Sequence, residues 1–90
     1  MPDYISQMDE IYAATLDAEA TTEQRLDVAE TMGHVLARAE RALTRKDLSG
    51  EMRMRLGKLK RMAEDEIENA LGERDVLVHW TAMREMLTVF

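Results

Sequence analysis

The sequence predicts an all-α fold, a small helical bundle of three to four helices built on one long antiparallel hairpin. Strong helix formers such as Ala, Leu, Met, Glu and Arg dominate the 90 residues, and the one proline is at position 2. Apolar side chains recur every three or four residues, which is the spacing of one face of an α-helix. Because a chain this short cannot bury two independent cores, we expect a single domain over residues 1–90.

The first helix is predicted over residues 3–17. Asp3 can cap its N-terminus, because an aspartate side chain accepts a hydrogen bond from the free amides of the first turn. Polar residues such as Asp9 are expected to point outward. The apolar face comprises Tyr4, Ile5, Met8, Ile11, Tyr12 and Leu16. Thr21 and Gln24 then form a capping box at the start of the next helix.

The second and third helices are predicted over residues 22–46 and 50–71. Each carries apolar residues at alternating intervals of three and four, as in the seam of a coiled coil. The seams comprise Ala29, Met32, Leu36, Ala39 and Leu43 in the second helix, and Met52, Leu56, Leu59, Ala63, Ile67 and Ala70 in the third. Val28 and Val35 widen the second seam. The short connection, with Ser49 as the next cap, predicts an antiparallel hairpin.

The fourth helix is predicted over residues 75–90, with Asp75 as its cap and Gly72 as a left-handed cap that ends the third helix. Its seam comprises Val76, Trp80, Met83, Leu87 and Phe90. If Gly72 is instead tolerated inside a helix, the third and fourth helices fuse into one rod, and such a rod would demand a dimer.

Several classes of function are disfavoured by composition. The chain has no cysteine, so disulfides and thiolate chemistry are excluded. No stretch approaches the roughly eighteen apolar residues of a membrane span, and the first residues carry acid rather than base. We therefore expect a cytoplasmic protein without membrane contact.

No residues form a recognisable reactive site. Ser6 and Ser49 are better explained as a surface residue and a cap, and no glycine-rich phosphate loop is present. Glu30 and His34 lie one helical turn apart, but a pair of ligands falls short of a metal site. His79 is expected on the inner side of the fourth helix as a hydrogen-bonded core residue. We expect no enzyme activity, no cofactor and no metal.

The predicted helix over residues 22–46 carries a cationic stripe opposite its apolar seam, formed by His34, Arg38, Arg41 and Arg45. Lys58 and Arg61 are expected on the outward face of the third helix. Residues 38–61 hold nine Lys and Arg against three acids, whereas the first twenty residues hold five acids and no base. Cations in the first turns of the third helix oppose its dipole, which leaves solvation, an acidic protein or nucleic acid as explanations.

Apolar residues are also expected outside the seams. Met54 projects outward among cations, and Val78, Met86 and Val89 extend the apolar arc of the fourth helix beyond what a four-helix bundle uses. Either this flank is buried in a compact monomer, or it contacts a second copy or a partner.

These features predict a non-enzymatic interaction protein, such as an adaptor, an assembly chaperone or a small inhibitor. Its partner is expected to be another protein, and a second copy of the chain, forming a homodimer, is the alternative. The runner-up is a nucleic-acid-binding regulator, against which the net charge of −6 counts. The acidity of the first helix suits mimicry of nucleic acid as well as it suits solubility. The predicted binding residues are Arg38, Arg41, Arg45, Met54, Lys58, Arg61, Val78, Met86 and Val89.

Overall fold

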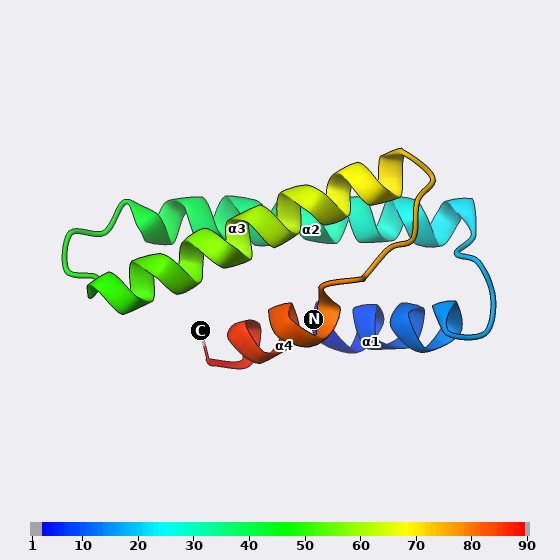
Figure 1. Ribbon diagram of the computed structural model, residues 1–90, viewed down its shortest axis with the longest axis horizontal. Coiled ribbons are helices and arrows are strands. Elements are labelled where there is room, and N and C mark those ends of the chain that lie inside the picture. The colour runs from blue at the N-terminus through cyan, green and yellow to red at the C-terminus, as the bar shows by residue number, and fades with distance from the viewer. Residues whose placement is uncertain (1–2, 90) are drawn as a thin grey trace.

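The computed structural model describes residues 3–89, and within them the chain forms four helices and no strand (Figure 1). The helices are α1 (Tyr4–Thr15), α2 (Thr22–Leu43), α3 (Gly50–Leu71) and α4 (Trp80–Val89). Helices α2 and α3 pack along their length as an antiparallel hairpin, which confirms the predicted fold class. Phe90, the last predicted seam residue, lies outside the described residues.

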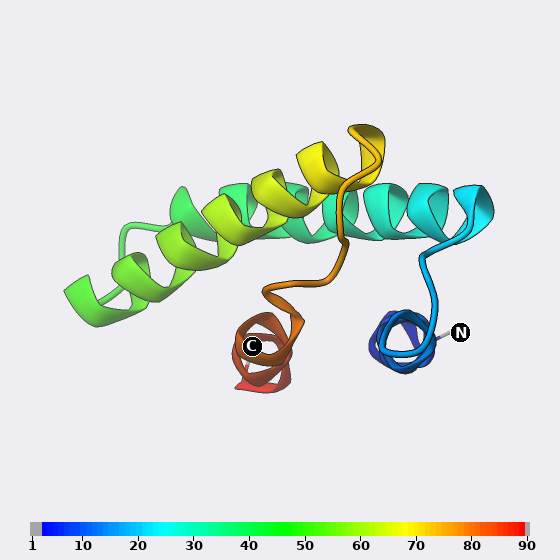
Figure 2. The same cartoon turned by 45° about the vertical axis from the view of Figure 1, so that its right-hand side comes forward.

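The helices are arranged in two layers. The α2–α3 hairpin forms one layer, and the shorter helices α1 and α4 lie together on one of its faces (Figure 1). Figure 2 views α1 and α4 nearly end-on while the hairpin runs across the picture, so the short helices cross it obliquely. The tip of the hairpin extends beyond the end of α4 (Figure 1).

Helices α1, α2 and α3 each begin at the N-cap residue that the sequence predicts. The Asp3 carboxylate accepts a hydrogen bond from the amide two residues later, at 3.0 Å. Thr21 and Gln24 exchange side-chain to backbone hydrogen bonds of 3.0 and 2.9 Å, which completes the capping box. The Ser49 hydroxyl accepts from the amide three residues later, at 3.1 Å. These interactions are local, and the sequence alone identifies them.

The C-terminal ends of α1 and α2 come two and three residues earlier than predicted. At each end a threonine hydroxyl donates to the carbonyl of the preceding turn: Thr15 to Tyr12 at 2.8 Å, and Thr44 to Arg41 at 2.6 Å. Such bonds compete with the helical pattern of backbone hydrogen bonds. Leu16 therefore lies beyond α1 and is 70% exposed, so its assignment to the apolar face was wrong.

Helix α3 ends at Leu71 with Gly72 as its cap, but Gly72 is not the predicted left-handed residue. Gly72 has φ −91°, and the left-handed residue is Glu73, with φ 57°. The Arg74 amide then bonds the Asn69 carbonyl at 2.9 Å, which satisfies a carbonyl of the last turn. A Cβ at Gly72 would lie 3.4 Å from the Arg74 guanidinium and 2.9 Å from the Glu68 carbonyl oxygen. Glycine is therefore favoured here by space rather than by its φ.

Helix α4 begins at Trp80, five residues later than predicted, and Asp75 does not cap it. Residues 72–79 form an irregular segment, so α3 and α4 are separate and the fused rod is wrong. Leu77 has φ 62° and is fully buried, and Val76 is also buried. Val76 and Leu77 thus enter the core from an irregular segment and not from a helical turn.

A buried carboxylate explains this irregular segment. Glu66 of α3 is completely inaccessible to solvent, and its two oxygens accept hydrogen bonds from the amides of Leu77 and His79, each at 2.9 Å. The Asn69 side chain adds a third hydrogen bond at 3.2 Å. Because these amides are satisfied by a side chain, the segment needs no helical pattern of hydrogen bonds. The apolar spacing of α3 does not predict that Glu66 is buried, although this residue lies one turn from the buried Ala63 and Ala70.

The face of α2 that is buried in the core is rotated about the helix axis from the face that the predicted seam defines. Val28 and Val35, expected only to widen the seam, are fully or almost fully buried, whereas Ala29 and Leu36 are only partly buried. The second layer, α1 and α4, covers the valine side of α2. The core comprises Met8, Ile11, Val28, Met32, Val35, Ala39, Leu56, Leu59, Ala63, Ala70, Val76, Leu77, Trp80, Met83 and Leu87.

Asp9 joins the two short helices. Its carboxylate accepts a hydrogen bond from the Trp80 indole at 2.7 Å, and the Arg84 guanidinium contacts both oxygens at 3.0 and 3.1 Å. The prediction that Asp9 points to solvent was therefore wrong. Asp9 would point outward if α1 were isolated, but in the folded chain the same side of α1 contacts α4.

The Asp9 contacts predict a specific acid sensitivity. The Trp80 hydrogen bond, with smaller contributions from Arg84, lowers the pKa of Asp9 below its ordinary value of 3.8. A lowered pKa in the folded state stabilises the protein above that ordinary value, and this stabilisation is lost as pH falls through the folded-state pKa. We expect Asp9→Asn to weaken the pH dependence of the free energy of unfolding below about pH 4, measured by urea unfolding.

Asp17→Asn is the matched control, because this exposed carboxylate forms no side-chain hydrogen bond or ion pair within residues 3–89. It should leave the acid slope close to that of the wild type. An identical slope in wild type and Asp9→Asn would contradict the expected role of Asp9.

Candidate docking surface

A groove lies between the first half of α3 and the second half of α4. It is a hollow of about 370 Å³, which we call the α3–α4 groove. It is lined by Met52, Arg55, Lys58, Ala82, Glu85, Met86 and Val89, so one carboxylate of α4 stands among the cations and apolar side chains. Helix α3 supplies both cations and α4 supplies most of the apolar side chains, so the groove exists only because the two helices pack side by side.

The α3–α4 groove combines flexible apolar groups with charge at its edge. Met52 and Met86 are half-buried, while Val89 is 70% exposed. Arg55 is held by Glu51 at 2.8 Å. Lys58 forms no ion pair or hydrogen bond within the described residues, so its ammonium group is available to an external acid. Thioether side chains adapt to differently shaped partners, which suits a binding surface.

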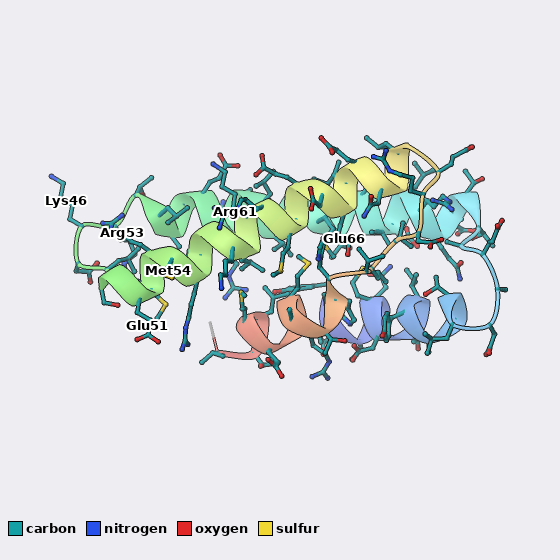
Figure 3. The ribbon with its side chains drawn as sticks, viewed as in Figure 1. Lys46, Glu51, Arg53, Met54, Arg61 and Glu66 are labelled. Carbon is teal, nitrogen blue, oxygen red and sulfur yellow. The ribbon has the colours of Figure 1, made fainter. Side chains whose placement is uncertain are left out.

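The structure brings together three of the predicted binding residues, Lys58, Met86 and Val89, in the α3–α4 groove. Val78 lies apart from them, before α4, where it is 59% exposed and shares a hollow with Leu16. Met54 is 64% exposed on α3 and, like Arg61, does not line the groove (Figure 3). The fourth helix therefore has no single apolar flank from Val78 to Val89.

The cationic stripe of α2 does not point directly away from the core. His34, Arg38 and Arg41 border a hollow beside Tyr4 of α1, and Arg38 and Arg45 border another beside α4. The Arg38 guanidinium donates to the Tyr4 hydroxyl at 3.1 Å. The second layer brings α1 and α4 alongside the stripe, and Leu56 and Leu59 of α3 line the same hollow as Arg38 and Arg45.

Several cations at the hairpin tip have local structural roles. The Arg53 guanidinium donates to the carbonyls of Leu43 and Arg45 at 3.1 and 2.7 Å, which caps the end of α2. Arg45 pairs with Asp47 at 2.9 Å and lowers the pKa of that carboxyl. Within residues 3–89, the cations without a hydrogen bond or ion pair are Arg41, Lys46, Lys58, Lys60 and Arg61.

Folding the hairpin separates charge along the 43 Å long axis. The tip, residues 38–61, holds nine Lys and Arg against three acids. The opposite end contains residues 16–27 and 64–75, where Arg25 and Arg74 are outnumbered by Asp17, Glu19, Glu23, Asp27, Glu64, Asp65, Glu66, Glu68, Glu73 and Asp75. The molecule is therefore basic at the tip and acidic at the end where the layers connect (Figure 1).

Within residues 3–89, no group of three or more His, Asp or Glu is arranged to hold a metal ion. His34 and Glu30 are 4.0 Å apart and largely exposed. His79 precedes α4 and is only half-buried, with its Nε2 atom 3.3 Å from Asp65. In the same part of the chain, no helix is long and apolar enough to cross a membrane.

Comparisons with models of known protein families, with curated proteins and with solved structures found no match.

Proposed function

We propose that this chain is a non-enzymatic interaction module, an adaptor, assembly chaperone or small inhibitor acting in the cytoplasm, which docks a partner protein in the α3–α4 groove. The observation that supports it is the convergence in one hollow of exposed Val89, adaptable Met52 and Met86, and Lys58, which has no ion pair or hydrogen bond among residues 3–89. An apolar hollow with a charged edge fits the anatomy of protein interfaces, in which a few buried anchors supply most of the affinity.

In this proposal, apolar contacts and charged groups contribute differently to docking. An apolar side chain of the partner enters between Met86 and Met52, while an acidic group beside it meets Lys58. The basic tip attracts acidic surfaces over a longer range and raises the association rate. A second copy of this chain is an alternative occupant of the same groove.

Val89→Lys tests the groove directly. Val89 is mostly exposed, so lysine should be tolerated in the fold, but it places a charge against the apolar anchor of the partner. Loss of one buried valine contact and the added desolvation should weaken binding about 10- to 100-fold. We would capture partners from nuclease-treated lysate with each variant, identify them by mass spectrometry, and measure affinity with the purified partner.

Val78→Lys is the matched control, because it is an equally drastic change at an exposed valine outside the groove. A partner retained by wild type and Val78→Lys but lost by Val89→Lys would support the proposal. Equal loss in both variants, or equal retention in both, would contradict it. Sedimentation of the purified protein would identify a second copy as the occupant.

A nucleic-acid-binding regulator is the second candidate, favoured by the unpaired cations Arg41, Lys58 and Arg61 near the tip. Binding through phosphates should weaken steeply between low and physiological salt. Recovery of only nuclease-sensitive material in the capture experiment would select this alternative.

A further inference from the structure

The outer side of α3 carries a stripe of residues that contributes nothing to the core. Its members recur at alternating intervals of three and four residues, so they lie along one face of the helix. This face is turned away from the buried side of α3, and no helix covers it among the described residues (Figure 1). The members, which we call the α3 outer stripe, are Met54, Gly57, Arg61, Glu64, Glu68 and Leu71.

The α3 outer stripe is accessible, and its charged groups have no partner within residues 3–89. Met54 and Leu71, at its two ends, are 64% and 66% exposed. The side chains of Arg61, Glu64 and Glu68 are exposed and form no hydrogen bond or ion pair with the described residues. The stripe therefore presents apolar groups at its ends and charged groups between them.

The charge of α3 opposes the dipole of the helix along its whole length. The first half, residues 50–61, holds five Lys and Arg against one acid, and the second half, residues 62–71, holds four acids and no base. Cations near the N-terminus of a helix and acids near its C-terminus are both unfavourable. Helix α2 does not compensate, because antiparallel pairing places its acidic half beside the acidic half of α3. A neighbour with the reversed order of charge would relieve both halves.

An antiparallel second copy of α3 has this reversed order. The intervals within the stripe read the same in both directions, so a twofold axis between residues 62 and 63 places every member opposite another member. The opposing pairs are Met54 with Leu71, Gly57 with Glu68, and Arg61 with Glu64 of the second copy. Each pair occurs twice because of the symmetry. Apolar ends thus meet apolar ends, and opposite charges meet at the centre.

We propose that the α3 outer stripe binds a second copy of this chain, with the two α3 helices antiparallel. Ion pairs at an exposed surface each contribute little, and apolar contact is confined to the two ends of the stripe, so the dimer forms reversibly. Nucleic acid would meet the basic half of α3 but would be repelled by Glu64 and Glu68. A second copy is favoured because it supplies the complementary order of charge.

Paired charge reversals test this arrangement. Arg61→Glu places like charges opposite each other at both central pairs, and so does Glu64→Arg, so each variant alone should associate at least tenfold more weakly than wild type. An equimolar mixture of the two variants restores both ion pairs and should dimerise. Both variants keep a net negative charge, so general attraction would not bring them together. Sedimentation equilibrium at low salt, up to millimolar concentration, measures the association.

Lys46→Glu is the matched control, because Lys46 lies at the hairpin tip, outside the stripe, and has no hydrogen bond or ion pair within residues 3–89 (Figure 3). It should change association less than twofold, and circular dichroism would verify that every variant is folded. A wild-type monomer at millimolar concentration, equal loss in Arg61→Glu and Lys46→Glu, or a mixture that stays monomeric would each overturn the proposal.

Val89→Lys should leave this association unchanged, because no member of the α3 outer stripe lines the α3–α4 groove. Failure of the dimer is therefore distinguishable from failure of the proposed function, which depends on Val89. A dimer lost in Val89→Lys but retained in Arg61→Glu would overturn the proposal and assign the second copy to the groove.

Disulfide formation tests the register, since the chain contains no cysteine of its own. On mixing under mild oxidation, Met54→Cys and Leu71→Cys should form a disulfide with each other faster than either variant forms one with itself. Parallel pairing would instead bring equivalent residues together. Equal rates, or faster disulfide formation within each variant alone, would overturn the antiparallel arrangement.

Discussion

Glu66→Ala is expected to lower the free energy of unfolding by about 3 to 4 kcal/mol, because it leaves the amides of Leu77 and His79 without their acceptors. Each buried amide left unpaired costs about 1 to 3 kcal/mol, and the variant also opens a small cavity. A small protein has only about 5 to 15 kcal/mol of stability, so much of it would be lost. Urea unfolding followed by circular dichroism measures this change.

The neighbouring Glu64→Ala is the matched control. Glu64 is exposed on the same helix, so its replacement should change the free energy of unfolding by no more than about 0.5 kcal/mol. Hydrogen exchange at the Leu77 and His79 amides would localise the effect, since both should exchange faster in Glu66→Ala. A loss below 1 kcal/mol, with protection unchanged, would show that Glu66 does not anchor the segment before α4.

Trp80→Ala is expected to cost about 3 to 5 kcal/mol of unfolding free energy, the range for removing a large buried aromatic side chain. Trp80 is 1% exposed and belongs to the core, and its indole also donates to Asp9 of α1. The change therefore removes packing and the hydrogen bond between α1 and α4 together. Unfolding is again followed by circular dichroism, because the variant has no tryptophan to report fluorescence.

Trp80→Phe separates the two contributions. Phenylalanine keeps much of the packing but cannot donate to Asp9, so a smaller loss is expected, of which about 1 kcal/mol is due to the hydrogen bond. If Trp80→Phe proves as damaging as Trp80→Ala, packing of the ring is not the larger contribution and the expected order is wrong.

The start of α4 shows where reasoning from sequence fails. Asp75 has the character of a cap, and the capping preference correctly predicts the starts of α1, α2 and α3. At residue 75 it is overridden by Glu66, whose carboxylate lies 11 residues from one of its partners along the chain. A side chain that satisfies amides from another element leaves no signal in the local pattern.

The fold brings together only some of the residues predicted to bind a partner. Lys58, Met86 and Val89 were identified from exposure and residue type, and they meet in one groove. Val78 satisfied the same criteria but lies before α4 and outside the groove, because the residues around it do not form the helical turns that would have aligned it with Val89. The α2 stripe was correctly read as cationic, while the hollows beside it depend on where α1 and α4 lie.

The sequence by itself determined the all-α class and the three capped helix starts, because these depend on interactions between residues at most four positions apart. It also determined the hairpin, because the short connection between the second and third helices favours antiparallel packing. Only the tertiary structure decided that Asp9 meets Trp80, 71 residues away, and that Val28 and Val35 belong to the core. The charge separation is of the same kind. Residues 21–50 and 51–72 each carry no net charge, but antiparallel pairing places their basic halves together at the tip and their acidic halves at the opposite end.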